Sequence, residues 1–225
     1  MSLQCVLSAA VAASLFIQSA TAWAGASLLI DDATITPHGH CQAETWARVY
    51  APGQELTAVP ACNWANTEVG LGLSHDTHSS HGPLATLGLK RLFRDFDQHA
   101  WGVGASFGAT WNGANNRLDG WNLNLPASFA IDDQRHTVLH ANLGWSDSRD
   151  GSGSITAGIG LEQVLTESWT LLGEIYCDHR GSTSSQFGVR RAIGQTTTLD
   201  LLVGHQDDQQ QAPWLTVGLN ILLPN

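Results

Sequence analysis

The most regular pattern in the chain is a strict alternation of apolar side chains with small or polar ones over residues 101–111. Alternation with a period of two is typical of a β-strand, because successive side chains leave opposite faces of the pleat. The odd positions run from Trp101 to Trp111, and the even positions are glycines, a serine and a threonine. The step from one tryptophan to the other covers roughly 33 Å of strand, or about 25 Å of height at a tilt of about 40°. This is the apolar band between the aromatic girdles of an outer-membrane barrel, so we expect lipid on one side and a lumen on the other.

The same alternation recurs along the rest of the chain and predicts an all-β fold, an antiparallel transmembrane β-barrel of about twelve strands. An even number suits a single-chain bacterial barrel. Longer connections rich in Gly, Asn, Asp, Ser and Gln alternate with short turns, as outer loops alternate with periplasmic turns in such barrels. The expected strands cover residues 41–50, 56–64, 67–75, 84–92, 99–111, 119–130, 135–146, 154–165, 168–178, 185–193, 196–205 and 213–223.

Composition supports a membrane location and excludes one class of partner. Charged residues are 13% of the 225, and Lys90 is the single lysine. A soluble domain carries about 25% charged residues, and most of its surface must be charged or polar. The net charge of -10 argues against nucleic acid, because no basic stripe exists to neutralise phosphates. The expected partners are outer-membrane lipid and a small-molecule solute, and no cofactor-binding motif is present.

The amino-terminal region predicts export. Val6–Ile17 is an apolar run of signal-peptide length, and Ala22-Trp23-Ala24 after it resembles a cleavage site. We therefore expect residues 1–24 to be a cleaved signal peptide that directs the chain to the bacterial outer membrane. Residues 25–40 are polar and acidic and do not alternate, so they are expected to be a periplasmic lead-in or a plug segment. Residues 41–225 then form the barrel.

The cysteines predict one disulfide. Cys41 and Cys62 flank a hairpin whose turn lies at residues 51–53, so they fall nearly opposite each other. Export makes oxidation possible, and such a disulfide should stabilise the fold by roughly 3 kcal/mol. The alternative is a pair of free thiols. Cys177 is left over and is expected to act as a small apolar side chain.

A histidine-rich stretch follows the third expected strand. His75, His78 and His81 lie within seven residues, and imidazoles this close together could hold Zn²⁺ or Cu²⁺. The alternative is a solvated outer loop in which the histidines are polar filler. The stretch also offers serines beside histidine, as a membrane-embedded lipid hydrolase would need, but no spacing places nucleophile, base and acid together. We therefore do not predict an enzyme.

Four charged residues fall at inward-facing positions of the alternation in the strands of the carboxyl-terminal third of the chain: Glu162, Glu174, Arg190 and Asp200. An arginine on the lipid face at mid-depth costs about 2–4 kcal/mol, which favours the lumen for Arg190. With hairpin centres near residues 166, 181 and 194, Glu174 falls beside Arg190, and Arg190 beside Asp200. Such pairs either hold the barrel wall together or take part in selecting a solute.

Short motifs resemble a known family. The motifs are Ile30–Ala33 (Ile-Asp-Asp-Ala), Gly39–Glu44 (Gly-His-Cys-Gln-Ala-Glu) and the segment Thr166–Glu174 with its turn, tryptophan and inward glutamate. They look like parts of the proteobacterial outer-membrane barrels labelled for the meta-pathway of phenol degradation and their uncharacterised relatives. The resemblance implies a barrel that passes small solutes, including apolar ones. One departure is the carboxyl end, Leu222–Asn225, which lacks the terminal aromatic residue of such barrels.

The function predicted from these patterns is passage of a small solute through a narrow, porin-like pore or transporter. A lumen of twelve strands lies between the packed interior of eight-stranded barrels and the open channels of sixteen-stranded ones. It can therefore be a narrow pore or be plugged by residues 25–40. The alternatives are a membrane-embedded lipid hydrolase and a closed structural barrel without transport.

Overall fold

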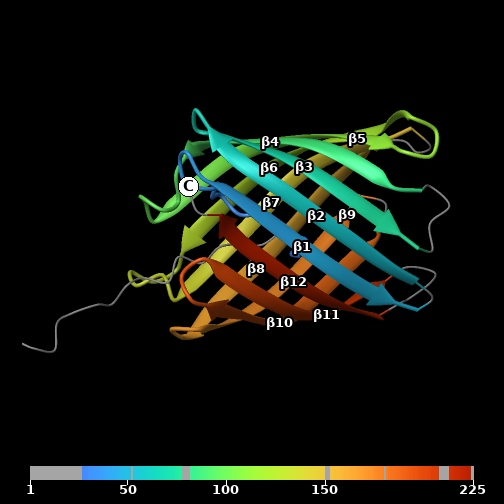
Figure 1. The fold of residues 1–225 in the computed structure, drawn as a ribbon. Helices are drawn as coiled ribbons and strands as arrows, with labels where there is room; N and C mark the ends of the chain where they lie inside the picture. Colours follow the sequence, from blue (N-terminus) through green and yellow to red (C-terminus); the bar gives the residue numbers. More distant parts are fainter. Residues whose placement is uncertain are drawn as a thin grey trace, which may run out of the picture.

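The computed structural model describes residues 27–51, 53–77, 82–149, 153–179, 181–207 and 213–223, which form one closed barrel of twelve antiparallel strands (Figure 1). Each strand pairs with its neighbours in sequence, and β1 also pairs with β12, so no sheet edge remains. The predicted fold class is confirmed, with every expected strand present within a few residues of its expected bounds. The strands are β1 (Cys41–Tyr50), β2 (Gly53–Trp64), β3 (Thr67–Asp76), β4 (Leu84–Arg94), β5 (Trp101–Asn112), β6 (Arg117–Ala130), β7 (Thr137–Ser148), β8 (Ser154–Thr166), β9 (Trp169–Asp178), β10 (Thr183–Ile193), β11 (Thr197–Asp207) and β12 (Pro213–Leu223).

The two faces of the barrel follow the alternation of the sequence. On β5, Trp101, Phe107 and Trp111 face outward and are 44%, 42% and 41% exposed, whereas the glycines between them face the lumen. Every described strand leaves at least one large apolar side chain exposed on this outer face. An apolar surface that runs round the whole molecule requires lipid rather than water around it. No helix of the described residues is long and apolar enough to cross a membrane.

The predicted disulfide is present. Cys41 and Cys62 are cross-strand partners on β1 and β2, and their sulfur atoms are bonded. The bridge ties the two strands together at the end of the barrel where β1 begins, which we call the proximal end. Cys177 is a free thiol exposed on the outer face of β9.

The connection between β4 and β5 covers part of the proximal end. Its Phe96 is 4% exposed and packs in a small apolar cluster with Ala33 and Val138. The guanidinium of Arg135, from the next proximal turn, lies 4.9 Å from the centre of the Phe96 ring. A side chain at Gly102 would meet the Phe96 backbone at 2.6 Å, so this glycine lets the connection approach the wall. The proximal mouth is therefore narrowed by an aromatic side chain.

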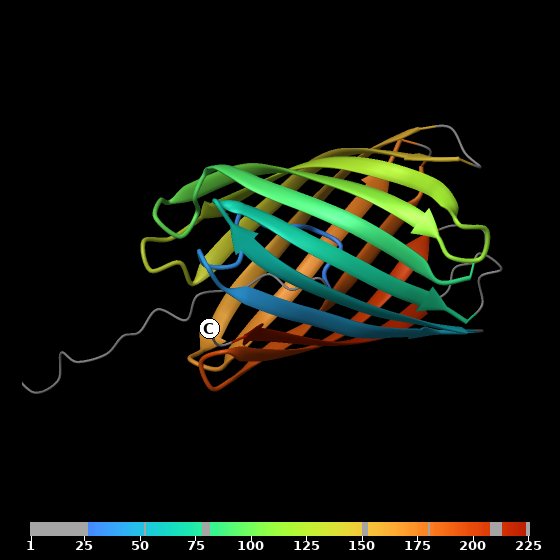
Figure 2. The same ribbon diagram turned by 45° about the horizontal axis from the view of Figure 1, so that its top comes forward.

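Residues 27–36 do not join the sheet but run inside the barrel, where Figure 2 shows them as a blue loop between the walls. Gly39 and His40 then pair with Asn63 of β2 and lead into β1. Ser27, Ile30, Ala33 and Thr36 are all 2% exposed or less. We call residues 27–36 the lumen segment. The region that the sequence predicted to be a lead-in or plug thus lies within the lumen.

Candidate functional site

The start of the lumen segment is held by carboxylates and an amide of β9, β10 and β11. Glu174 accepts hydrogen bonds from the backbone N–H groups of Leu29 and Ile30, at 2.7 and 2.9 Å. The hydroxyl of Ser27 donates to Asp200 at 2.6 Å. Gln186 donates to the carbonyl of Ser27 at 3.0 Å and also contacts Glu174. These wall side chains satisfy backbone groups that water would otherwise have to solvate.

The middle of the lumen segment is held by β6 and β7. The amide of Asn142 accepts from the backbone N–H of Asp31 at 2.9 Å and donates to the carbonyl of the same residue at 2.6 Å. This pair of bonds copies one rung of a β-ladder with a side chain in place of a strand. The hydroxyl of Ser128 accepts from the N–H of Ala33 at 2.8 Å.

The end of the lumen segment is held by β2, β3 and β4. Glu68 accepts from both the N–H and the hydroxyl of Thr36, at 2.7 and 2.5 Å, and Asn63 donates to the Thr36 carbonyl at 2.6 Å. The Lys90 ammonium donates to Asp31 at 2.6 Å and to Asp32 at 3.0 Å. The lumen segment therefore behaves as a bound peptide, with specific polar partners on both halves of the barrel.

Two inward glycines provide the space for this peptide. A Cβ at Gly158 of β8 would lie 2.1 Å from Cδ1 of Ile30, and one at Gly218 of β12 would lie 2.7 Å from Cβ of Ser27. No larger residue fits at either position while the lumen segment stays in place. The contacts of these glycines with the lumen segment cannot be read from the sequence, because they join residues far apart in the chain.

The four predicted charged residues all face the lumen, but one predicted pairing is wrong. Arg190 and Asp200 are cross-strand partners joined by two hydrogen bonds of 2.7 and 2.9 Å, as expected. Glu174, however, is the partner of Gln186 rather than of Arg190. The β9–β10 hairpin turns earlier in the chain than the prediction assumed, which slides Glu174 along the wall away from Arg190. The second carboxylate at the guanidinium is Glu162, at 3.2 Å.

These side chains form a buried group, Glu162–Arg190–Asp200, whose members are 2%, 4% and 0% exposed. The guanidinium presents a fork of donors to Asp200 and a further donor to Glu162, the arrangement in which arginine binds carboxylates most strongly. Asp200 in turn accepts from Ser27. The group thus ties β8, β10 and β11 to the lumen segment, while Glu174 holds the same segment from β9.

A serine, a histidine and a carboxylate meet beside this group, which the sequence did not suggest. The Ser128 hydroxyl lies 2.8 Å from Nδ1 of His140, and Nε2 of His140 lies 4.0 Å from Glu162. Ser128 is fully buried and already accepts the hydrogen bond from Ala33. The three residues come from β6, β7 and β8 and link these neighbouring strands by polar contacts on the lumen side.

The predicted metal ligands are only partly described. His75 lies near the end of β3, on the outward face, and is exposed. His78 and His81 lie outside the described residues. The described ranges contain no group of three His, Cys, Asp or Glu side chains arranged to hold a metal ion. The histidine site therefore stays a prediction.

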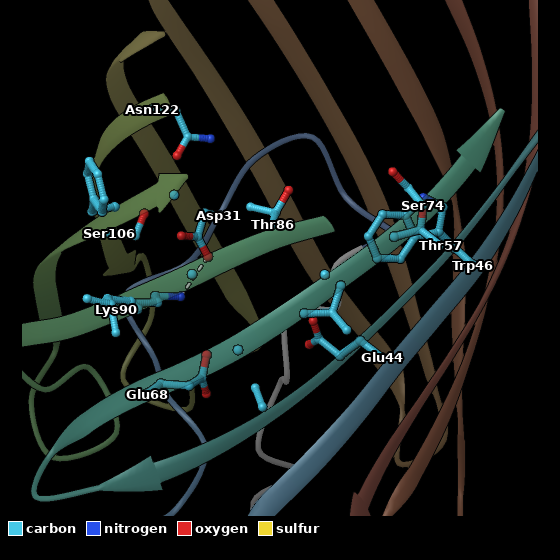
Figure 3. Close-up of a pocket in the computed structure, with 18 of the residues that line it drawn as sticks. Asp31, Glu44, Trp46, Thr57, Glu68, Ser74, Thr86, Lys90, Ser106 and Asn122 are labelled. Carbon is cyan, nitrogen blue, oxygen red and sulfur yellow. Dashed lines mark hydrogen bonds and ion pairs between the residues drawn. The ribbon is translucent and has the colours of Figure 1, made fainter. Parts of the chain in front are cut away.

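A cavity of about 460 Å³ occupies the lumen beside the lumen segment, against the inward faces of β1 to β6 (Figure 3). Its carboxylates are Asp31, Glu44, Glu55 and Glu68, and its one ammonium is that of Lys90. Figure 3 shows Glu68, Lys90 and Asp31 close together, with the Lys90–Asp31 contact drawn as a dashed line. The rest of its polar lining is made of hydroxyls, an amide and an indole: Trp46, Thr57, Ser74, Thr86, Ser106 and Asn122. The alternation over residues 101–111 places Ser106 inward, but nothing in the sequence groups it with the other residues of the cavity.

The fold and the lumen together define a twelve-stranded transmembrane barrel that holds its own amino-terminal segment inside. The chain belongs to the family described as uncharacterised conserved protein UCP029691, whose model matches residues 11–223. No curated protein matches the sequence.

Several solved outer-membrane barrels share this fold. The KdgM porin is 10% identical with a TM-score of 0.66, and the alignment covers 80% of this chain and 98% of the porin. The NanC porin is 9% identical with a TM-score of 0.61, over 81% of this chain and 100% of the porin. The COG4313 outer membrane channel from Pseudomonas putida F1 is 10% identical with a TM-score of 0.50, over 85% of this chain and 98% of the channel. At such identities the likeness concerns the fold alone, and the resemblance to the phenol meta-pathway barrels stays a prediction.

Proposed function

We propose that this protein is an outer-membrane channel for a small polar solute. The observation that carries the proposal is a closed barrel with an apolar exterior and a polar cavity running along one half of its lumen. A purely structural barrel of this size has no need of such a cavity, since side chains could fill it. In this proposal residues 1–24 are the cleaved signal peptide, and the proximal end of the barrel faces the periplasm.

The lumen segment makes the channel narrow. It lies mainly against the inward faces of β6 to β12, where its residues contact Glu174, Asn142 and Ser128. Further contacts tie it to Glu68 of β3 and Lys90 of β4. The cavity lies on the other side, against β1 to β6. Solute passage is therefore confined to that second half, and the lumen segment acts as a partial plug.

The cavity walls favour a polar solute over the apolar one that the family resemblance implied. Carboxylates, an ammonium, hydroxyls and one amide line it beside a few apolar side chains, and an apolar solute would leave the polar groups without water or partner. The KdgM porin has been solved in complex with disordered oligogalacturonate, a chain of carboxylated sugars. An anionic chain of that kind does not suit this cavity, where carboxylates outnumber the ammonium group.

Planar-bilayer recording of the purified, folded protein tests the proposal. We expect discrete conductance steps, smaller than those of sixteen-stranded porins, and larger steps after deletion of residues 27–36. A folded protein that never conducts, with or without that deletion, would instead support the closed structural barrel. Release of fatty acid from phospholipid vesicles by the same preparation would support the lipid hydrolase.

A further inference from the structure

We infer that the lumen cavity selects small organic cations, and that Glu44 is the residue that sets this preference. The inference rests on the proposed channel function and names its class of solute: a protonated amine that also carries hydroxyl groups. It follows from the balance of charge around the cavity, the chemistry of the opposite wall and one unsatisfied donor.

The other carboxylates of the cavity are already engaged. Asp31 lies 2.6 Å from the Lys90 ammonium, and Glu55 lies 3.5 Å from the guanidinium of Arg48. Glu68 accepts two hydrogen bonds from the lumen segment. Each of these groups therefore has a cation or a pair of donors that offsets the cost of removing its charge from bulk water.

Glu44 has no such compensation among the described residues. Its one hydrogen bond there comes from the neutral amide of Gln42, at 3.3 Å, and no ion pair to it is formed. Figure 3 shows its side chain at the cavity, on the wall made by β1. When it is ionised, a carboxylate that faces a confined aqueous space without a counter-charge attracts cations into that space and repels anions.

The opposite wall offers hydrogen bonds, and its one charged side chain in the cavity, Lys90 of β4, is already paired with Asp31 and Asp32. Thr86, Ser106 and Asn122, from β4, β5 and β6, present two hydroxyls and an amide to the cavity. A solute that enters can therefore place a positive group toward Glu44 and its hydroxyl groups toward these side chains. Because the one ammonium on the far wall repels a cation and is already paired with Asp31 and Asp32, the cavity orients the solute with its cationic end toward Glu44.

Trp46 supplies a further recognition group next to Glu44. The two residues are two apart on β1, so their side chains share the inward face about 7 Å apart. The indole N–H of Trp46 is buried and has no hydrogen-bond partner within the described residues. An unpaired buried donor is costly, and an oxygen atom of a bound solute would satisfy it. Carboxylate and donor together match an amino alcohol or amino sugar, and about 460 Å³ is room enough for one.

Charge selectivity is tested by reversal potentials of the full-length protein in a KCl gradient at alkaline pH, where the Glu44 carboxylate is ionised. We expect the wild type to prefer K⁺ over Cl⁻. Glu44→Gln should lower the K⁺/Cl⁻ permeability ratio by about threefold or more, because one unscreened charge a few ångströms from a permeating ion has an effect of that order. Glu167→Gln is the matched control, because it removes the same charge from an exposed proximal turn outside the lumen. It should leave the ratio unchanged.

Solute recognition is tested with glucosamine hydrochloride in place of KCl on one side of the bilayer. Trp46→Phe keeps an aromatic ring but removes the N–H, so it should lower glucosamine permeability while the K⁺/Cl⁻ ratio stays that of the wild type. A channel that prefers anions, or whose preference is the same in Glu44→Gln as in the wild type, overturns the inference but leaves the channel function standing. Equal glucosamine permeability in Trp46→Phe overturns the role of the indole. A protein that folds but conducts in no variant overturns the channel function itself.

Discussion

Replacement of Arg190 by glutamine tests whether the buried charged group holds the barrel wall together. The variant removes a guanidinium that is 4% exposed and leaves Glu162 and Asp200 facing each other without a cation between them. Removing one partner of a buried ion pair costs about 3–5 kcal/mol, because the remaining charge is desolvated and uncompensated. Two carboxylates are left here, so we expect a loss of unfolding free energy in the upper part of that range.

The comparison with Asp200→Asn gives the prediction its control. In that variant the amide oxygen, in the place of Oδ2, still accepts from Nη2 of the guanidinium and from Ser27, and Arg190 keeps its contact with Glu162. Only the bond from Nε to Oδ1 is lost. We therefore expect Arg190→Gln to destabilise the barrel more than Asp200→Asn by about 2 kcal/mol or more. Urea unfolding in detergent micelles, followed by the circular dichroism of the strands, measures both values. Equal losses in the two variants would refute the reasoning, since they would mean that water reaches the group and screens its charges.

Three further predictions concern other parts of the protein. Gly158→Leu should displace the lumen segment and raise the single-channel conductance several-fold. The control is Gly173→Ala, whose added methyl group meets no atom within 4 Å, so its conductance should equal that of the wild type. An unchanged conductance in Gly158→Leu would mean that the lumen segment does not obstruct the pore. Hydrogen bonds from the backbone N–H of His136 and of neighbouring residues in the β6–β7 turn lower the pKa of Asp132. The stability that this carboxylate contributes is therefore complete above its ordinary pKa of about 4 and is lost as the pH falls through the lowered value. The unfolding free energy of Asp132→Ala should therefore fall less steeply with decreasing pH than that of the wild type. An identical pH dependence in the two proteins would show that Asp132 does not contribute this stability. Titration calorimetry with Zn²⁺ should show a site that disappears in the His78→Ala, His81→Ala double variant. Binding that persists in the double variant would show that these histidines do not form the metal site.

The sequence by itself determined the properties that depend on neighbours along the chain. Alternation at Trp101–Trp111 requires only that successive side chains leave opposite faces of a strand, and the same rule identified all twelve strands. The Cys41–Cys62 disulfide was predictable because a short turn fixes which residues of a hairpin lie opposite each other. The pair Arg190–Asp200 follows from the same rule applied to β10 and β11.

Only the tertiary structure decided which groups meet across the lumen. Glu174 was paired with the wrong strand position because a small displacement of one turn slides a whole strand along its neighbour. Its true partners, the backbone N–H groups of Leu29 and Ile30, are 145 and 144 residues away in the chain and lie beside it only once the barrel has closed round the lumen segment. The isolation of Glu44 has the same origin, because the closed barrel directs Lys90 and Arg48 to other carboxylates. Alternation tells which side of the wall a residue occupies, but closure of the barrel and the path of the segment inside it decide what that residue binds.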